Sequence, residues 1–220
     1  MKPNRIILIR HGESEGNADK NIYARKPDYA LRLTDPGKQQ ARKAGQALRE
    51  LIGSESIGFY VSPHFRTRET FQELVKAFEE LPLIEREEPR IREQEWGHFR
   101  SLAEGAAVDR ERDAYGTFHY RIPDGESAAD VYDRVSDFFG TLFRDFKKDE
   151  FPQNIVIVTH GMTARLFLMR WFHWTVEKFE SLPNPSNCGT YILERTDSDK
   201  YRLLTDTGER PPVHPWRMDP

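Results

Sequence analysis

The stretch RIILIRHGESEGN, residues 5–17, decides the fold of this chain. Its four consecutive apolar residues, Ile6–Ile9, predict a short strand that is buried on both faces. Arg10 and His11 follow directly, so a cation and an imidazole stand at the carboxyl end of a buried strand, where open α/β sheets bind ligands. Gly12 allows a tight turn whose backbone N–H groups face an anion. The stretch therefore predicts a phosphate site that contains a histidine.

Length and composition limit the class of protein. The chain has 220 residues, of which 37% are hydrophobic and 31% charged, and its net charge is −3. This length suits a single domain with a sizeable core. The charge balance lacks the basic block that nucleic acid needs, and no apolar run approaches the ~20 residues of a membrane helix.

Two further features bear on the compartment. The first residues lead straight into the predicted strand, so we expect no signal peptide. The single cysteine, Cys188, excludes an intrachain disulfide and a thiolate metal cluster. We expect a cytoplasmic protein without nucleic-acid or integral membrane partners.

Apolar patterns along the rest of the chain alternate between strand and helix. Further strands are predicted at residues 57–61, 83–85 and 155–159, with a late hairpin or pair of strands at 190–194 and 201–204. Helices are predicted at residues 34–52, 64–80, 127–146 and 162–174. This order predicts an α/β fold, a mainly parallel sheet with helices on both faces in three αβα layers.

Three segments lie outside this alternation. Residues 19–32 are polar and without a clear period, so we interpret them as a loop. Residues 98–124 are predicted to form a small lid-like insertion over the active edge of the sheet, with a helical stretch at 102–114. The tail, residues 206–220, contains four prolines and is expected to be extended. The chain is thus expected to be one domain, residues 1–220.

Polar residues follow three of the predicted strands, and they share one chemistry. They are Arg10-His11-Gly12, Ser62 with Arg66, and Thr159-His160-Gly161. In a parallel sheet these ends meet at one edge, where guanidinium forks suit the oxygens of a phosphoryl group. Nearby cations are expected to keep His11 neutral, so that its lone pair attacks phosphorus and forms a phosphohistidine. His160 is expected to be protonated and to donate to the phosphoryl oxygens.

Glu93 is the candidate for the general acid that protonates the leaving oxygen. The leaving oxygen needs a proton, and a carboxyl group that supplies it can later activate water, a contribution of roughly 10²–10⁴ in rate. These residues together predict transfer of a phosphoryl group to a histidine.

Six motifs in order make the chain resemble the histidine phosphatase superfamily (branch 1), the phosphoglycerate-mutase-like enzymes. They are Arg10–Asn17, Leu33-Thr34-x-x-Gly37, Ser62-Pro63-x-x-Arg66-Thr67-x-x-Thr70, Ile91-x-Glu93, Gly125-Glu126-Ser127 and Thr159-His160-Gly161. Together they span about residues 5–193. Residues 90–97 and 123–135 further resemble a branch of these enzymes found in plants, fungi and bacteria.

The resemblance implies a role for each matching position. The catalytic positions are His11 as the phosphorylated nucleophile, Glu93 as the proton donor, and His160. The phosphate-binding positions are Arg10, Arg66, Asn17 and Gly161, the last through its backbone N–H. The family needs no metal and no cofactor for this chemistry.

The segment around the acid departs from the usual family pattern, in which Leu-x-Glu is followed by a small loop and Gly. Here residues 91–97 read IREQEWG, which makes Glu95 a rival of Glu93. The motif spacing favours Glu93. The histidines interpreted as ordinary residues are His64, His98, His119, His173 and His214.

We therefore expect a phosphatase that hydrolyses a small phosphorylated substrate. One alternative is a phosphoglycerate-type mutase. The span from Glu93 to Gly125, about thirty residues, is shorter than the insertion that closes mutase sites, which favours hydrolysis. Another alternative is an inactive relative that binds phosphorylated ligands. The presence of every expected catalytic and phosphate-binding residue argues against this alternative. A sugar phosphate, a nucleotide, a phospholipid headgroup and a phosphopeptide remain open as substrates. The residues expected to shape the pocket are Tyr115, Phe118, Tyr120 and Arg121, and a homodimer is considered.

Overall fold

A six-stranded sheet forms the centre of the molecule. The computed structural model describes residues 2–78, 83–98, 101–205 and 207. The strands are β1 (Arg5–Arg10), β2 (Ile57–Val61), β3 (Leu83–Glu87), β4 (Asn154–Thr159), β5 (Thr190–Arg195) and β6 (Tyr201–Leu203). They lie in the order β3-β2-β4-β1-β5-β6. The first four strands along the chain pair in parallel, and β5 and β6 are antiparallel to their neighbours.

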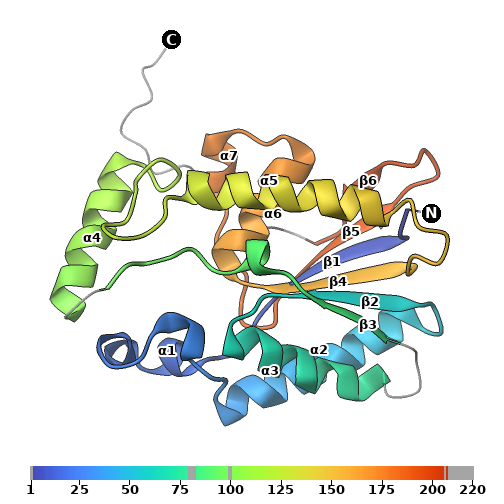
Figure 1. Ribbon diagram of the computed structural model, residues 1–220, viewed down its shortest axis with the longest axis horizontal. Coiled ribbons are helices and arrows are strands. Elements are labelled where there is room, and N and C mark those ends of the chain that lie inside the picture. The colour runs from blue at the N-terminus through green and yellow to red at the C-terminus, as the bar shows by residue number, and fades with distance from the viewer. Residues whose placement is uncertain (1, 79–82, 99–100, 206, 208–220) are drawn as a thin grey trace.

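Helices cover both faces of this sheet. The α-helices are α1 (Glu15–Ala18), α2 (Asp35–Ile52), α3 (Phe65–Leu74), α4 (Leu102–Tyr115), α5 (Ala128–Asp145), α6 (Gly161–Phe172) and α7 (Val176–Ser181). Four short 3-10 helices add η1 (Lys20–Ala24), η2 (Asp28–Ala30), η3 (Val75–Phe78) and η4 (Pro89–Ile91). Figure 1 shows α2 and α3 on one side of the sheet and α5 and α6 on the other. The predicted three-layer α/β fold is confirmed.

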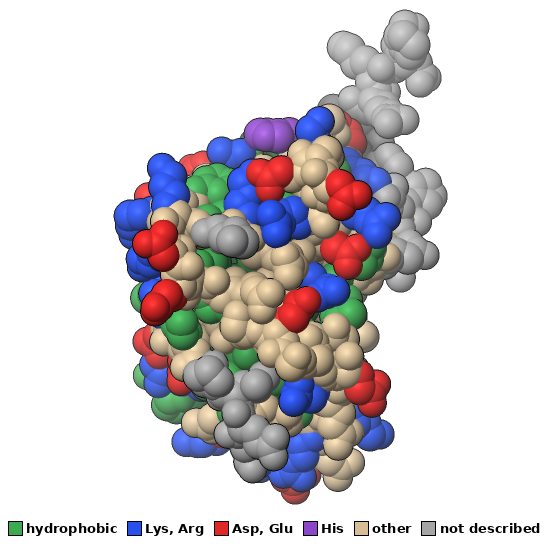
Figure 2. Space-filling model, turned by 90° about the vertical axis from the view of Figure 1, so that its right-hand side faces the viewer, with side chains coloured by type: hydrophobic (Ala, Val, Ile, Leu, Met, Phe, Trp, Pro, Cys, Tyr) green, Lys and Arg blue, Asp and Glu red, His purple; other side chains and the backbone are tan. Residues whose placement is uncertain are grey.

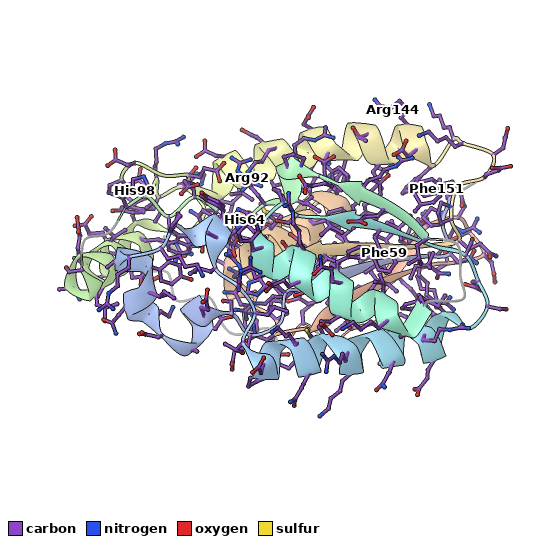
Figure 3. The ribbon with its side chains drawn as sticks, turned by 60° about the horizontal axis from the view of Figure 1, so that its bottom comes forward. Phe59, His64, Arg92, His98, Arg144 and Phe151 are labelled. Atoms are coloured by element: carbon purple, nitrogen blue, oxygen red, sulfur yellow. The ribbon has the colours of Figure 1, made fainter. Side chains whose placement is uncertain are left out.

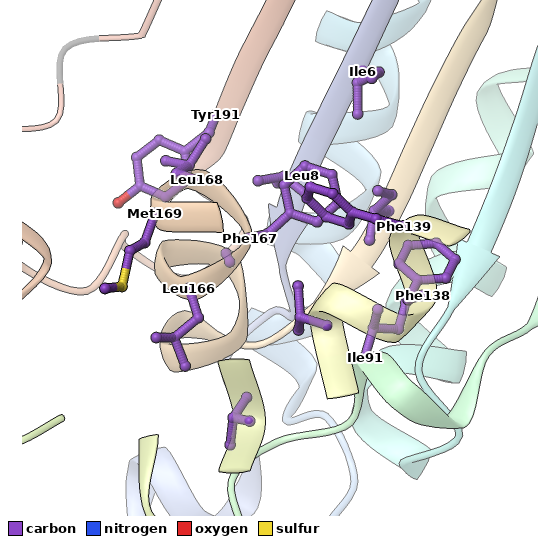
Figure 4. Packing of buried hydrophobic residues seen from close by; sticks show 14 of the residues in the cluster. Ile6, Leu8, Ile91, Phe138, Phe139, Leu166, Phe167, Leu168, Met169 and Tyr191 are labelled. Carbon is purple, nitrogen blue, oxygen red and sulfur yellow. The ribbon is translucent and has the colours of Figure 1, made fainter. Parts of the chain in front are cut away.

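The apolar run of β1 divides between two cores. Ile6 and Leu8 belong to the cluster formed with α5 and α6, whereas Ile7 and Ile9 belong to the cluster formed with α2 and α3. All four side chains are fully buried. Figure 4 shows Leu8 among the aromatic rings of the first cluster. A strand with apolar residues on both faces is what a doubly covered parallel strand requires.

Local signals explain where the long helices begin and end. Thr34 caps α2 by accepting a hydrogen bond from the Gly37 N–H, at 3.1 Å. Gly53 ends the same helix with a positive φ of 61°, a conformation that glycine adopts without strain. Ser127 and Asp130 form the expected capping box at the start of α5. Phe143 lies on the outer side of α5 and is 47% exposed.

Several segments differ from the sequence-based expectation. Residues 19–32 were interpreted as a loop, but they contain η1 and η2. The short helix α7 was not predicted, because a six-residue helix is too short to develop a period. Residues 98–124 do contain the expected helix, α4. The predicted extended tail, residues 206–220, lies outside the described residues except for Thr207.

Figure 2 draws the end of the molecule that carries the amino terminus. Acidic and basic side chains are intermixed over the face drawn in Figure 2. Within the described residues, no helix has both the length and the apolar character needed to cross a membrane.

Two mid-helix glycines make a matched test of this packing. A Cβ atom on Gly45 of α2 would lie 2.5 Å from the backbone oxygen of Leu74 in α3, whereas a Cβ atom on Gly140 of α5 would meet nothing within 4 Å. We expect Gly45→Ala to lower the free energy of unfolding by about 1–3 kcal/mol through overpacking. Gly140→Ala should raise it by about 0.5–1 kcal/mol through helix propensity. Urea unfolding of both variants measures the difference, and stabilisation by Gly45→Ala would contradict the close approach of α2 and α3.

Candidate active site

Three parallel strands bring the predicted site residues together. The backbone ladders continue past the strand ends, since the His11 N–H donates to Thr159 at 2.9 Å and the Ser62 N–H donates to Val158 at 3.0 Å. As a result the rings of His11 and His160 meet edge to face, with centroids 5.2 Å apart. The convergence expected from the strand order is present.

The imidazole of His11 is held in one tautomer. Its Nδ1 lies 2.7 Å from the carbonyl oxygen of Gly12, which can only accept, so the proton is on Nδ1 and the lone pair is on Nε2. Nε2 lies 3.3 Å from the donating Nε of Arg66. Burial, followed by the charges of Arg66 and Arg10, holds the pKa of His11 well below 6.5. The ring is therefore neutral at pH 7, as its neighbours in the sequence suggested.

A hydrogen bond to the Thr70 side chain and two close backbone approaches fix the loop that carries His11. The Gly12 N–H donates to the Thr70 hydroxyl at 3.0 Å. A Cβ on Gly12 would lie 2.5 Å from the Gly37 carbonyl oxygen, and one on Gly37 would lie 2.0 Å from the carbonyl oxygen of Glu13. The motif ending at Gly37 is thus explained by packing, because the first turn of α2 rests directly on the loop.

Arg66 is oriented by an acid that the sequence analysis did not identify. Its Nη1 and Nη2 donate to the backbone oxygen and to Oδ2 of Asp28, at 2.7 and 2.9 Å. One edge of the guanidinium is therefore held by Asp28, and its Nε is left directed at His11. Asp28 lies in η2, inside the segment interpreted as a loop. Its one sequence signal is an acid directly after Pro27, which does not distinguish it from other loop acids.

His64 also belongs to this cluster, which corrects its interpretation as an ordinary histidine. The residue precedes α3 and is buried. Its Nδ1 lies 3.4 Å from Oδ2 of Asp28, and its ring packs against that of His160 with centroids 4.9 Å apart. Burial favours the neutral form of Asp28, but the hydrogen bonds and charges of His64 and Arg66 outweigh it and lower the pKa of Asp28 to about 2.

His160 is fully buried and differs from expectation in its charge. Its Nε2 lies 2.8 Å from the Ser62 hydroxyl, and its Nδ1 lies 3.9 Å from Oε2 of Glu93. Burial, then the charge of Arg66, holds its pKa well below 6.5. The expected protonated His160 is therefore wrong for the ligand-free protein. When the Ser62 hydroxyl donates to Nε2, the neutral ring still offers a donor at Nδ1.

The carboxyl group of Glu93 lies in the site, whereas that of Glu95 is exposed. Burial raises the pKa of Glu93 above 4.5, against the opposing charge of Arg66. The Thr159 hydroxyl donates to Ile91 at 2.7 Å and the Thr163 hydroxyl donates to Arg92 at 2.8 Å, so the end of β4 and the start of α6 hold this segment. The geometry favours Glu93 over its rival.

Glu126 supports the same segment from the start of α5. Its Oε1 accepts from Arg92 at 2.6 Å, and its Oε2 accepts from Arg134 at 2.9 Å and from the Glu95 N–H at 3.1 Å. Arg134 also donates to the backbone oxygen of Glu93 at 3.0 Å. Figure 3 places Arg92 and His64 at the same end of the molecule, far from Phe151. The Gly125-Glu126-Ser127 motif therefore positions the acid through the backbone.

The remaining predicted phosphate ligands lie around His11. Arg10 donates through Nη1 to the Pro185 carbonyl at 2.7 Å, and its buried Nε has no hydrogen-bond partner among the described residues. The Asn17 side-chain oxygen accepts from the Ser14 N–H at 3.1 Å and from Asn187 at 3.0 Å. Because the oxygen of the Asn17 side chain is occupied, its amide N–H groups are the part of the side chain that can donate to a phosphoryl oxygen.

Gly161 is the first residue of α6, where backbone N–H groups have no acceptor within the helix. A Cβ at this position would lie 2.7 Å from the side-chain oxygen of Asn184. The position therefore combines an N–H group that the helix itself does not pair with a close contact that excludes a larger residue.

Residues of the insertion that were expected to shape the pocket have polar groups paired within the protein. The Tyr120 hydroxyl donates to Glu111 at 2.7 Å, and Arg121 donates to Asp130 at 2.6 Å. Phe118 is buried in the core cluster. Over the described ranges, no group of three or more His, Cys, Asp or Glu side chains is arranged to hold a metal ion.

The site as a whole can bind and transfer a phosphoryl group. It joins a neutral imidazole whose Nε2 lone pair faces the Nε of Arg66, two guanidinium groups, a second imidazole donor and a carboxyl group with a raised pKa. Guanidinium groups bind phosphoryl oxygens, the imidazole is a nucleophile toward phosphorus, and the carboxyl group can move a proton.

Comparison with known proteins agrees with this chemistry. The family model of the histidine phosphatase superfamily (branch 1) matches residues 6–206. Phosphoglycerate mutase-like protein AT74H of Arabidopsis thaliana is 46% identical, with 95% of this chain and 80% of that protein covered. Broad-range acid phosphatase DET1 of Saccharomyces cerevisiae is 32% identical, with 93% of this chain and 89% of that protein covered.

Solved structures share the fold at lower sequence identity. A mycobacterial glucosyl-3-phosphoglycerate phosphatase in complex with VO3 superposes with a TM-score of 0.72 and 21% identity, covering 94% of this chain and 100% of that chain. The YhfR protein of Bacillus stearothermophilus superposes with a TM-score of 0.69 and 22% identity, covering 94% and 97%. These likenesses support the architecture of a mainly parallel sheet between two layers of helices.

The lowered pKa of Asp28 predicts a pH-dependent contribution to stability. A carboxyl whose pKa falls from 3.8 in the unfolded chain to about 2 in the folded protein stabilises the fold by roughly 2 kcal/mol above pH 4. That contribution is lost as the pH falls toward 2. Urea unfolding of the wild type and of Asp28→Asn from pH 2 to 6 should show a difference that grows with pH. A difference of constant size would contradict the charge pairing with Arg66.

Proposed function

The chain belongs to branch 1 of the histidine phosphatase superfamily, and we propose that it hydrolyses phosphate monoesters through a phosphohistidine at His11. The observation that carries the proposal is the state of this imidazole. Its Nδ1 proton is held by the Gly12 carbonyl, and its pKa lies well below 6.5, so Nε2 is an available nucleophile at neutral pH.

In the first step, the Nε2 lone pair of His11 attacks phosphorus while the ester P–O bond breaks. The leaving oxygen takes the proton of Glu93, whose raised pKa favours the protonated form that this step needs. The products are the free alcohol and phospho-His11. The Nδ1–H bond to Gly12 compensates the positive charge that develops on the ring.

In the second step, the Glu93 carboxylate removes a proton from water, and the water oxygen attacks phosphorus. The N–P bond breaks, its electron pair returns to Nε2, and inorganic phosphate leaves. The proton from water replaces the one that Glu93 gave to the leaving alcohol, so one cycle consumes one water molecule and restores both groups.

Charge on the transferred phosphoryl group is balanced by side chains that the fold has already placed. Arg66 is fixed through Asp28, and Arg10 is fixed through the Pro185 carbonyl. His160 contributes a neutral Nδ1 donor when Ser62 donates to its Nε2. Fixed donors of this kind contribute about 3 kcal/mol each to transition-state stabilisation.

Hydrolysis is favoured over mutase activity by the size of the insertion. The described part of residues 98–124 contains one helix, α4, of 14 residues, and the 32% identical yeast relative bears the name of an acid phosphatase. A mutase must shield phosphohistidine from water while the substrate reorients. Because other relatives bear mutase-like names, isomerisation of phosphoglycerate is the second activity to assay.

We also propose that turnover needs no metal, because two guanidinium groups supply the positive charge and the neutral imidazoles supply the nucleophile and a hydrogen-bond donor, and that the protein works in the cytoplasm. The single cysteine, Cys188, allows no intrachain disulfide, which suits a reducing compartment. Activity that is unchanged by EDTA would support the first proposal. Cell fractionation tests the second.

The nucleophile is tested by replacing two histidines in the same way. His11→Asn should lower kcat on an aryl phosphate by a factor on the order of 10³–10⁶ and abolish the acid-labile phosphoenzyme trapped by rapid quench. The control, His173→Asn, changes an exposed left-handed residue to one that tolerates this backbone. Unchanged turnover by His11→Asn would refute the phosphohistidine route. Isomerised phosphoglycerate without released phosphate would favour the mutase.

The acid is tested by the pair Glu93→Gln and Glu95→Gln. We expect Glu93→Gln to lower kcat on alkyl phosphates by roughly 10²–10⁴, and to have a smaller effect on aryl phosphates, whose leaving oxygen needs less help. Because only protonated Glu93 can donate, kcat/KM of the wild type should fall on the alkaline side as Glu93 ionises above pH 4.5.

That alkaline limb should be missing in Glu93→Gln and present in Glu95→Gln. Ionisation of the substrate is common to all three proteins and cancels in the comparison. If the alkaline limb is instead missing in Glu95→Gln and present in Glu93→Gln, the general acid is Glu95.

A further inference from the structure

A carboxylate lies beside the phosphate pocket, where the proposed mechanism gives it only an orienting role. Oδ2 of Asp28 accepts from Nη2 of Arg66 at 2.9 Å and lies 3.4 Å from Nδ1 of His64. The Asp28 side chain is largely buried, and its charge acts on the pKa of both His11 and Glu93. A negative charge that acts on the nucleophile also repels a negatively charged ligand bound there.

The two arginines of the pocket differ in their charge compensation. Arg66 forms an ion pair with Asp28. Among the described residues, no carboxylate lies within ion-pair distance of Arg10. Its Nη1 donates to the Pro185 carbonyl at 2.7 Å, and its buried Nε has no hydrogen-bond partner in the described part of the chain. Two guanidinium groups and one carboxylate thus leave the pocket with a single uncompensated positive charge, that of Arg10.

Other titratable groups around Asp28 leave this balance unchanged at neutral pH. Burial keeps the imidazole of His11 neutral, raises the pKa of Glu93 and raises the pKa of Tyr23, in η1, to about 12. His64 would add a positive charge beside Asp28 in its protonated form, and Glu93 would add a negative charge in its ionised form. A test of the balance must therefore separate the ionisation of these two residues from that of the ligand.

Arg165 is a further buried cation at this end of the molecule, but its donors have other partners. Its Nη1 donates to the Leu182 carbonyl at 2.6 Å, and its Nη2 lies 3.6 Å from the sulfur of Met162. Its guanidinium also lies over the ring of Phe179, in α7. We therefore assign direct contact with a phosphoryl group to Arg10 and to the free donors of Arg66.

We propose that the carboxylate of Asp28 makes the pocket select the monoanionic form of a phosphoryl group over the dianionic form. A monoanion neutralises the uncompensated cation, whereas a dianion leaves an excess negative charge in a buried site next to that of Asp28. The substrates are then phosphate monoesters in their singly charged state, and inorganic phosphate leaves more readily once it ionises. This inference rests on the phosphate pocket of the proposed function and deepens it.

The test uses phosphonates, which cannot be hydrolysed, so it does not depend on turnover. Methylphosphonate is compared with difluoromethylphosphonate, whose fluorine atoms lower the second pKa of the same anionic group. Isothermal titration calorimetry measures each Kd from about pH 5 to 9. A change in Kd caused by ligand ionisation occurs at a different pH for each ligand, whereas a change caused by His64 or Glu93 occurs at the same pH for both.

For the wild type we expect Kd to rise about tenfold for each pH unit above the second pKa of each ligand, because the fraction of monoanion falls in that proportion. Asp28→Asn removes the charge and keeps the shape, so this ligand-dependent rise should largely disappear. Asp28→Ser, which also lacks the charge, is the second variant if Asp28→Asn does not fold. The control, Asp35→Asn, removes a carboxylate that is 88% exposed at the start of α2 and should keep the wild-type rise.

Three results would overturn the inference: a wild-type Kd that does not rise with ligand ionisation, a rise in the Asp28 variants as large as in the wild type, or an equal loss of the rise in Asp35→Asn. The expected binding without hydrolysis of any ester would refute the proposed function alone. Failure of both phosphonates and inorganic phosphate to bind would refute the pocket and the inference with it.

Discussion

The guanidinium of Arg66 is the group on which the rest of the site depends. One of its edges is fixed by Asp28, and its Nε is directed at His11. Its charge lowers the pKa of both His11 and His160 and opposes the rise in that of Glu93. A buried cation would be costly alone, and Asp28, with its pKa of about 2, keeps it paired. Neutral imidazoles and a protonatable carboxyl therefore coexist within one buried cluster.

Main-chain contacts of the fold set where the loop that carries His11 lies. The parallel register pairs Arg10 with Thr159, which places the residues after both strands next to each other. The first turn of α2 then packs against the loop through Gly37, with no side chain between the two backbones. Backbone contacts involve no side-chain rotamers. The sheet therefore sets the distance between the nucleophile, His11, and the side chains that would bind phosphate. This is the preorganisation on which electrostatic catalysis depends.

Local sequence patterns were sufficient to predict the strands, whereas contacts between distant segments escaped prediction. Apolar runs revealed β1 and β4, and therefore where His11 and His160 would meet. Asp28 was missed because the partner that gives it a role, Arg66, is 38 residues away and its own segment has no period. His64 was taken as ordinary for the same reason. The charge of His160 was predicted wrongly because burial, the largest influence on its pKa, is a property of the assembled core.

Two buried arginines differ in how their charge is compensated. At the phosphoryl end, Asp28 pairs Arg66, so that its binding edge is set before any ligand arrives. Arg112 of α4 lies over the ring of Trp96, and its nearest carboxylate oxygen, of Asp109, is 3.9 Å away. A cation stabilised by a ring keeps its donors available, whereas one stabilised by an acid has used some of them. The residues that carry the chemistry are accordingly placed by the strands of the sheet, whereas the sequence of the insertion between β3 and α5 can change without disturbing the parallel strands.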